Sequence, residues 1–148
     1  LAERQRQVDT QLVAPEIAEK LNADRIRRFA ESEAFAKICA AEKVLRELAF
    51  ITALPAGAVL AAQGHEELPA AADAQVLVQG IADLVLVYPD HLELLDYKTD
   101  RRKTEADFLS AYRPQLNLYA LAIDKRFAPK KVTYKGICSL ELGKLIEV

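Results

Sequence analysis

Residues 79–98 constrain the fold of this chain most strongly, because they place charged side chains inside an apolar strand pair. Their sequence, QGIADLVLVYPDHLELLDYK, predicts two strands joined by a turn at 88–91. An unpaired ion costs several kcal/mol to bury. Asp83, Asp96 and Lys98 therefore either pair with one another or hold something outside the chain, such as a metal ion.

The register of this hairpin decides whether the two aspartates meet. One register pairs Tyr88 with His91 around a two-residue Pro-Asp loop. It places Asp83 opposite Asp96, and directly opposed residues share a face with Cβ atoms about 5 Å apart. A four-residue loop that pairs Tyr88 with Glu93 keeps this parity, whereas a three-residue loop turns Asp83 to the other face. Proline does not supply the positive φ of the favoured tight hairpin turns, so the loop width stays open. A shared metal site therefore predicts a loop with an even number of residues.

The composition is ordinary for a globular domain and excludes several classes of protein. The 148 residues are enough for one domain with a real core, and 51% hydrophobic with 28% charged residues is typical of globular proteins. No run of about 18 apolar residues spans a membrane, and no signal-peptide pattern opens the chain. The net charge of −2 lacks the strongly basic balance of many free-standing nucleic-acid binders. The chain has no methionine, even at position 1, which favours a piece of a larger protein.

Isolated cysteines and local basic clusters carry weaker signals. Cys39 and Cys138 lack the paired spacing of a zinc site, and a typical iron–sulfur cluster needs four thiolates. We therefore expect both to be reduced core residues of a cytoplasmic protein that has no iron–sulfur cluster. One basic cluster, 101–103, directly follows the strand with Asp96 and Lys98, so Arg101 is a candidate contact to a phosphate backbone.

Hydrophobic periodicity predicts one α/β domain over 1–148, with a helical segment over 1–42 and an α/β core over 43–148. Helix starts and caps in the first segment are expected at Pro15, Asn22 and Ser32. The expected core elements are a strand over 43–53, a long connection over 54–74 with an optional short strand at 57–60, strands over 75–88 and 91–99, a polar loop over 100–109, a helix over 110–126, a strand over 131–140 and a final strand in the terminal LIEV.

Two of these elements carry further expectations. Ser110 is expected to cap the helix over 110–126, with Pro114 tolerated in its first turn. Both faces of the strand over 75–88 are apolar, which predicts a central strand covered on each side. Gly80 inside that strand indicates a bulge or the close approach of another backbone.

The converging charges match the needs of a divalent metal. Mg²⁺ takes hard oxygen ligands and usually binds one or two carboxylates. Asp83 and Asp96 fit that demand, and the backbone carbonyl of Tyr97 offers a third oxygen. Lys98, two residues after Asp96, is placed to orient an attacking water or to offset charge on a phosphate, so the natural reaction is phosphodiester hydrolysis. The alternative is a surface Asp-x-Lys salt bridge worth less than about 1 kcal/mol.

The helix over 110–126 presents a second polar group. Gln115 and Tyr119 are four residues apart and share a face, and Tyr112 lies near the same stripe. These side chains suit hydrogen bonding to and stacking on a nucleotide. The alternative is an amphipathic helix whose polar edge holds them.

Three motifs together resemble a known family. GIAD at 80–83, LLDYKTD at 94–100 and YRPQLNLYA at 112–120 resemble the nuclease domains of the RecB-like branch of the PD-(D/E)xK superfamily. Within that branch, the chain is most similar to the C-terminal nuclease domains of AddA-type (RexA-type) subunits of bacterial ATP-dependent helicase–nucleases. VLRELAF at 44–50 also resembles the segment that precedes the site in that family.

The resemblance implies a restriction-endonuclease-like fold, a mixed β-sheet flanked by helices, and an enzyme that cleaves DNA with Mg²⁺, or Mn²⁺ as a substitute. In such a family the domain is an exonuclease, receives single-stranded DNA from helicase domains and acts with an AddB-type (RexB-type) partner subunit. The implied role is recombinational repair of double-strand breaks. ATP would be used only by helicase domains, which this chain lacks.

The resemblance also implies roles for individual residues. By motif position, Asp83 and Asp96 would be metal ligands with the Tyr97 carbonyl, and Lys98 the catalytic lysine. Accessory or DNA-contacting positions would be Gln115, Tyr119, Tyr112 and Arg101, with Glu47 as a weaker, supporting candidate.

The chain departs from the family at one position. The family has a histidine near the metal on a helix N-terminal to this region, but the chain offers only His65 in a loop and His91 in the hairpin turn. We therefore expect the chain to begin after that helix, with an incomplete site. Two other hypotheses stay open: a non-catalytic nuclease-like module that binds DNA or a partner subunit, and a nuclease of another branch, such as a stand-alone or CRISPR-associated exonuclease.

Overall fold

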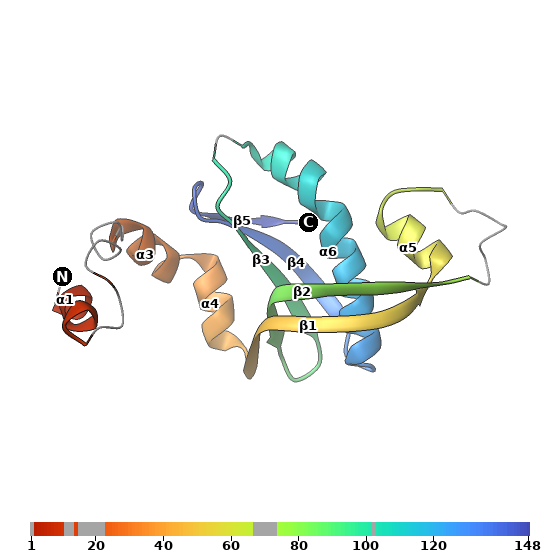
Figure 1. The fold of residues 1–148 in the computed structure, drawn as a ribbon, viewed down its shortest axis with the longest axis horizontal. Coiled ribbons are helices and arrows are strands. Elements are labelled where there is room, and N and C mark those ends of the chain that lie inside the picture. The colour runs from red at the N-terminus through yellow and green to blue at the C-terminus, as the bar shows by residue number, and fades with distance from the viewer. Residues whose placement is uncertain (1, 11–13, 15–22, 67–73, 102) are drawn as a thin grey trace.

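Helices and strands follow one another as an α/β domain requires (Figure 1). The computed structural model describes residues 2–10, 14, 23–66, 74–101 and 103–148. Its elements are α1 (Ala2–Asp9), α3 (Ala23–Ala30), α4 (Glu33–Ala40), β1 (Lys43–Pro55), α5 (Ala56–Ala62), β2 (Gln75–Val87), β3 (Leu92–Lys98), α6 (Glu105–Arg126), β4 (Val132–Ser139) and β5 (Lys144–Glu147). The expected α/β class is confirmed.

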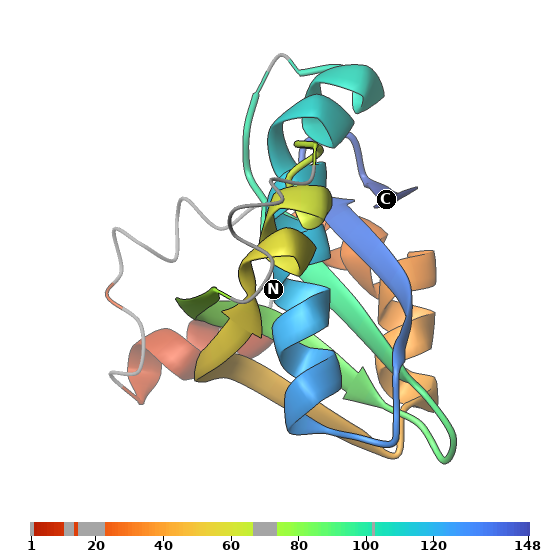
Figure 2. The ribbon, with the colours of Figure 1, turned by 90° about the vertical axis from the view of Figure 1, so that its right-hand side faces the viewer.

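The five strands form one mixed sheet in the order β1-β2-β3-β4-β5. Neighbouring strands are antiparallel except β3 and β4, which are parallel. A parallel pair needs a crossover connection, and α6 supplies it. Figure 2 shows α6 on one side of the sheet and α4 on the other.

Two apolar clusters hold these layers together. The larger one lies between the sheet and α6, and contains the fully buried Phe108, Leu116 and Ile123 of that helix. The smaller one, on the α4 side, is built on Leu84, Leu86 and Leu95, with Ile38 of α4 packed against it. Full burial of each such side chain contributes about 1.5–3 kcal/mol to stability. The sheet is therefore fixed from both sides in the region of β2 and β3.

The hairpin between β2 and β3 has the register that places the two aspartates opposite each other. The ladder pairs Val87 with Leu92 and Leu84 with Leu95, and the Tyr88 amide donates to the His91 carbonyl oxygen at 3.0 Å. The loop therefore has two residues, an even number, as predicted. It also avoids the positive φ values that proline excludes, because Glu47 is the only non-glycine residue of the described chain with such a value.

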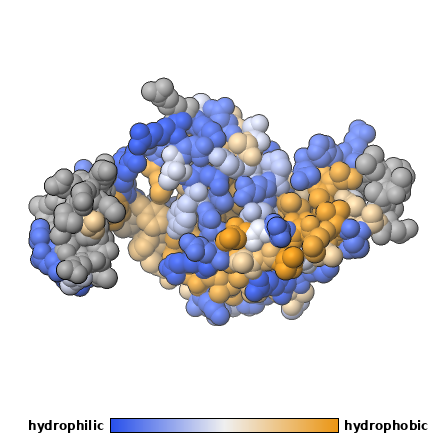
Figure 3. All heavy atoms as spheres, in the orientation of Figure 1, coloured by the Kyte–Doolittle hydropathy of each residue, from blue (hydrophilic) through white to orange (hydrophobic). Residues whose placement is uncertain are grey.

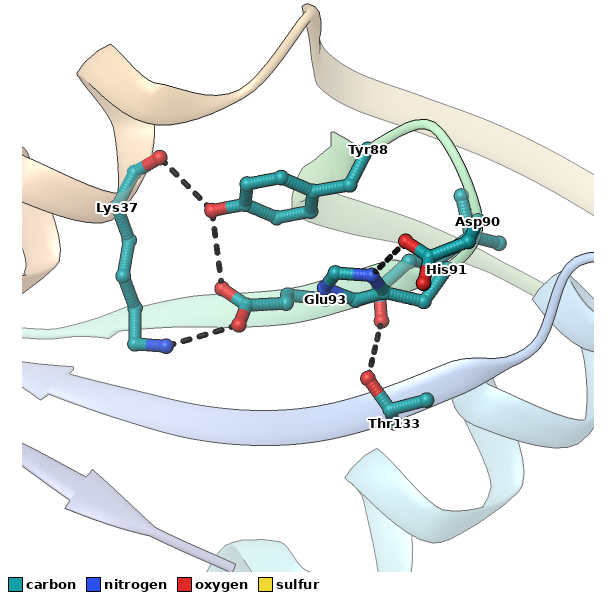
Figure 4. Close-up of polar contacts among 7 residues, drawn as sticks. Lys37, Tyr88, Asp90, His91, Glu93 and Thr133 are labelled. Atoms are coloured by element: carbon teal, nitrogen blue, oxygen red, sulfur yellow. Dashed lines mark hydrogen bonds and ion pairs between the residues drawn. The ribbon is translucent and has the colours of Figure 1, made fainter.

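A buried polar group fastens this hairpin to α4 (Figure 4). Lys37 Nζ lies 2.8 Å from Glu93 Oε1, and Tyr88 Oη lies 2.9 Å from the Lys37 carbonyl oxygen and 3.3 Å from Glu93 Oε2. The Tyr88 ring stacks on His91 at a centroid distance of 4.5 Å. His91 is thus part of the turn structure.

The expected helix over 110–126 was placed too late in the chain. α6 begins at Glu105, because Thr104 and Asp107 form a capping box in which each side chain accepts the other's backbone amide proton. Ser110 is therefore not the cap, and Pro114 lies well inside the helix. The polar composition of 100–109 hid this first turn.

Two further expectations about the elements were wrong. The segment Gly57–Leu60 belongs to helix α5, which its alanine-rich sequence favours. Cys39 is exposed rather than part of the core, whereas Cys138 is buried and its burial raises the pKa of the thiol to about 11. Ser32 caps α4 as expected, with its hydroxyl accepting the Phe35 amide proton at 3.3 Å.

Some expectations concern residues outside the described ones, namely Pro15, Asn22 and the middle of the connection over 54–74. No helix in the described part of the chain is long and apolar enough to cross a membrane.

Strands β1 and β2 both reverse their faces midway along their length. In β2, Ala82 packs in the α6 cluster, but Leu84 packs in the α4 cluster, although alternation would put both on one face. In β1, Val44 packs on the α4 side and Leu48 on the α6 side. The reversal falls at Glu47 and Asp83, the one opposed pair within this ladder that is not joined.

One half of β2 is consequently uncovered, so the expectation of a strand covered on each side is only partly correct. Beyond the reversal, Ile51, Leu77 and Ile81 are 65%, 67% and 58% exposed. Figure 3 shows hydrophobic surface over this part of β1 and β2.

Candidate active site

Asp83 lies at the point where β2 reverses, and its carboxylate is directed to the backbone of β3. Asp83 Oδ2 accepts a hydrogen bond of 2.9 Å from the Tyr97 amide. The β2–β3 ladder ends one pair earlier, at Leu84 and Leu95, so the side chain replaces the next backbone acceptor. In a strand, the amide and carbonyl of one residue point to the same neighbouring strand, so the Tyr97 carbonyl is also directed toward β2.

Asp96 is buried and poorly satisfied. Its exposed fraction is 4%, and no hydrogen-bond donor of the described residues is well aligned with Oδ2. The nearest cation is Lys98 Nζ at 2.5 Å, a contact that is close in distance but not well directed. Burial raises the pKa of the Asp96 carboxyl, Lys98 opposes this rise, and the charge of Asp83 adds to it. The site therefore brings two carboxylates and one ammonium group close together.

Lys98 projects to the α6 side of the sheet. Besides Asp96, its ammonium group lies 4.5 Å from the centre of the Tyr112 ring. A cation over an aromatic face is held by the ring quadrupole while it stays free to donate hydrogen bonds. Tyr112 therefore orients Lys98. The sequence placed Tyr112 only near the polar stripe of the helix and did not indicate this contact.

Two residues that sequence reasoning did not assign to the site hold Tyr112 in place. Tyr112 Oη donates to Asp100 Oδ2 at 2.9 Å and accepts from Lys103 Nζ at 3.2 Å. Lys103 also pairs with Asp100 Oδ1 at 2.8 Å, and these contacts hold the pKa of the Asp100 carboxyl below its usual value. The three-residue spacing of Asp100 and Lys103 indicated that the two could pair with each other. It did not indicate that both contact Tyr112 on the helix.

Tyr119 is seated on the sheet through Gly80. A Cβ atom at Gly80 would lie 2.7 Å from Tyr119 Oη and 2.8 Å from Phe50 Cζ, so only glycine leaves room for the two rings. The rings of Phe50 and Tyr119 meet edge to face at 4.9 Å. The expected close approach at Gly80 is real, but two side chains make it rather than another backbone. The register continues without a bulge at this residue.

A substitution of Gly80 tests this seating. We expect Gly80→Ala to lower the free energy of unfolding by about 1–3 kcal/mol through overpacking and to displace Tyr119. Gly57→Ala is the matched control, because no atom lies within 4 Å of its added Cβ and alanine favours helix α5 by about 0.5–1 kcal/mol. Thermal unfolding of the two variants measures both effects. Equal stability of both variants would contradict the tight packing at Gly80.

The side chains of Gln115 and Arg101 form no hydrogen bond within the described part of the chain. Gln115 is half-buried. Arg101 is exposed directly after the end of β3. Both side chains therefore keep hydrogen-bonding groups that a ligand can use.

Glu47 lies at the reversal of β1, next to Asp83. The two residues line a pocket of about 320 Å³ together with Arg46, Leu84 and Tyr97. Burial raises the pKa of the Tyr97 phenol to about 12, so it stays protonated at neutral pH.

Within the described residues, no three histidine, cysteine, aspartate or glutamate side chains come together as a metal site. His91 lies in the hairpin turn, where it stacks on Tyr88 and pairs with Asp90.

Comparison with known proteins agrees with this arrangement. The model of the PD-(D/E)XK nuclease superfamily matches residues 1–145. One ATP-dependent helicase/nuclease subunit, from Ligilactobacillus salivarius (strain UCC118), is 36% identical over 140 residues, which cover 94% of this chain and 11% of that protein. The protein of the same name from Desulforamulus reducens is 37% identical over 142 residues, covering 95% of this chain and 11% of that protein.

A third relative of this name, from Heliobacterium modesticaldum, is 33% identical over 140 residues, covering 90% of this chain and 9% of that protein. The chain thus spans about a tenth of the length of the curated relatives it matches. The family resemblance read from the motifs is confirmed, and the mixed sheet fits a restriction-endonuclease-like fold. From this match over nearly its whole length, the chain belongs to the PD-(D/E)XK nuclease superfamily.

Proposed function

We propose that the chain is the Mg²⁺-dependent deoxyribonuclease domain of a bacterial helicase–nuclease, acting as an exonuclease in the recombinational repair of double-strand breaks. The observation that carries the proposal is the buried, poorly satisfied oxygen of Asp96 between Asp83 and Lys98. Lys98 is the one ammonium group beside two carboxylates, and a divalent cation bound during function would supply the remaining positive charge.

The donor set fits a hard divalent cation. Asp83 and Asp96 would hold it, and the carbonyl of Tyr97 is directed to the same side as Asp83. A bound Mg²⁺ or Mn²⁺ supplies a Lewis acid and lowers the pKa of a coordinated water. The chain's own residues do the rest. Lys98 offsets charge on a phosphate oxygen, and Tyr112 keeps its ammonium group in place.

Substrate contacts are proposed on the same side of the molecule. Gln115 and Tyr119 share a face of α6, and Arg101 follows the end of β3, so they are suited to bases and phosphates of a single strand. In the longer protein, helicase domains would deliver that strand using ATP. The relatives are named as subunits of a helicase/nuclease, which supports a partner of AddB type.

Cleavage of labelled single-stranded DNA tests the proposal. We expect Mg²⁺- or Mn²⁺-dependent degradation that a chelator abolishes, and a loss of about a hundredfold or more on Asp83→Ala in the full-length protein. Asp90→Ala is the control, since Asp90 is exposed in the hairpin turn and its ion pair within the described part of the chain is with its neighbour His91. Mn²⁺ binding by calorimetry should be weakened in the first variant alone.

The opposite result identifies the alternative. If DNA or a partner subunit binds equally with and without chelator, and Asp83→Ala leaves both Mn²⁺ binding and cleavage unchanged, the domain is a non-catalytic nuclease-like module.

A further inference from the structure

Glu47 has a backbone conformation that its side-chain type disfavours. Its φ is 49°, and it is the only non-glycine residue of the described chain with a positive φ. The left-handed conformation is unfavourable for an ordinary residue, and it persists only where the surrounding structure imposes it. Such a residue inside a 13-residue strand therefore needs a structural explanation.

The Glu47 carboxylate does not provide that reason. The side chain is exposed, and within the described part of the chain it forms no hydrogen bond or ion pair. The backbone of Glu47, in contrast, has a clear consequence. It lies where β1 reverses its faces, with Arg46 still joined to Leu84 and Leu48 joined to Ala82 on either side.

The reversal frees Asp83 from the sheet. At the level where Glu47 and Asp83 are not joined, β2 also reverses its faces, and Asp83 leaves the regular alternation. Its carboxylate then reaches the Tyr97 amide at 2.9 Å, in the place of a backbone acceptor. In an unbroken ladder, a side chain at this position would stand away from the sheet.

The reversal also places Phe50 where it packs against Tyr119. After Glu47, the even-numbered residues of β1 turn to α6, so Phe50 packs in the α6 cluster. Phe50 is paired with Gly80 and meets the Tyr119 ring at 4.9 Å. Without the reversal, Phe50 would point to the uncovered face that carries Ile51 in the structure.

We infer that Glu47 is a positioning residue, whose left-handed backbone rather than its carboxylate places Asp83 and Tyr119 in the site. This inference rests on the proposed nuclease function and extends it to a residue outside the charged cluster. It predicts that the preference of a substitute for positive φ, not its charge, decides activity.

Three substitutions separate backbone from charge. Glu47→Gly accepts the left-handed conformation without a carboxylate, Glu47→Gln keeps the side-chain shape without charge, and Glu47→Val disfavours the conformation. We expect cleavage within about twofold of wild type for Gly and Gln. For Val we expect a loss of about tenfold or more and a similarly raised requirement for Mn²⁺, as for other residues that orient metal ligands.

Ala49 supplies the matched control, because it is exposed on the same strand and has a negative φ. There the order of stability should invert, with Ala49→Val at least as stable as Ala49→Gly. If Glu47→Val does not fold, Glu47→Ala replaces it, since positive φ is less unfavourable for alanine than for a β-branched residue.

Hydrogen exchange of the Tyr97 amide measures whether Asp83 still accepts its hydrogen bond, independently of cleavage. Its protection should survive in Glu47→Gly and fall about tenfold or more in Glu47→Val. If Glu47→Gln and Glu47→Gly lose activity as severely as Val while Tyr97 stays protected in all three, the carboxylate itself acts and the inference fails. If wild type shows no metal-dependent cleavage, the proposed function fails, and the Tyr97 exchange still decides the role of Glu47.

Discussion

Replacing Asp96 by asparagine is expected to abolish metal-dependent cleavage while raising the stability of the metal-free protein. Asp96 is 4% exposed and faces the charge of Asp83, so its carboxylate is costly to keep ionised. Asparagine keeps the shape and removes the charge. Lys98 loses its counter-ion but retains contact with the Tyr112 ring and with solvent. We expect cleavage to fall by about a hundredfold to a thousandfold, since one metal ligand is lost.

The stability gain should depend on pH in a defined direction. Burial raises the pKa of Asp96 above its ordinary value of 3.8, so the folded state binds this proton more tightly than the unfolded state. Stability therefore falls as pH rises from 3.8 through the folded pKa. The difference in melting temperature between Asp96→Asn and wild type should be small below pH 3.8 and should grow toward neutral pH.

Glu93→Gln is the matched control for this experiment. Glu93 is the other buried acid of β3, but it contacts Lys37 and Tyr88 on the opposite face of the sheet. Its loss should lower stability at neutral pH and leave cleavage unchanged. A decrease in the stability of Asp96→Asn equal to that of Glu93→Gln would show that Asp96 is satisfied in the fold without a metal ion.

The hairpin was predictable up to the width of its loop. The sequence indicates the turn at 88–91, and both a two-residue and a four-residue loop keep the parity. The structure has the two-residue loop between Tyr88 and His91, which brings Asp83 and Asp96 to the same level. The lysine two residues after Asp96 is on the same face by strand geometry alone. Residue spacing thus contains most of the information about this charged group.

The reversal at Glu47 was not predictable from spacing. Strict alternation places Val44 and Leu48 of β1 on one face, whereas they pack in opposite clusters. Nothing in a glutamate indicates positive φ, because that conformation favours glycine, asparagine and aspartate. The tertiary structure imposes it, so only the folded chain reveals how Asp83 turns toward Tyr97.

The support of the site was hidden for a related reason. Asp100 and Lys103 read as loop charges, but both contact Tyr112, about two turns into α6. The capping box that starts α6 lies in the same polar stretch. The spacing of the residues therefore indicated neither the start of the helix nor the contacts of Asp100 and Lys103 with Tyr112.

Replacing Lys98 by methionine should impair both catalysis and folding, whereas Lys98→Arg should rescue folding only. In the wild type, Lys98 Nζ lies 2.5 Å from Asp96 Oδ2 and is the nearest cation to that buried carboxylate. Methionine removes this cation, so we expect the free energy of unfolding to fall by on the order of 2 kcal/mol or more. Arginine restores the positive charge. It cannot place a compact ammonium group over Tyr112 at 4.5 Å, and its broad planar group changes the position of the donors.

Cleavage in both Lys98 variants should fall by about a hundredfold or more, because neither presents the ammonium group to the phosphate. Lys37→Met controls for the loss of a lysine that pairs with a buried acid, since Lys37 contacts Glu93 on the other face. It should lower the melting temperature but retain cleavage once the protein is folded. Wild-type rates in Lys98→Arg would show that positive charge alone is sufficient, and would remove the specific role of Tyr112 in orienting the lysine.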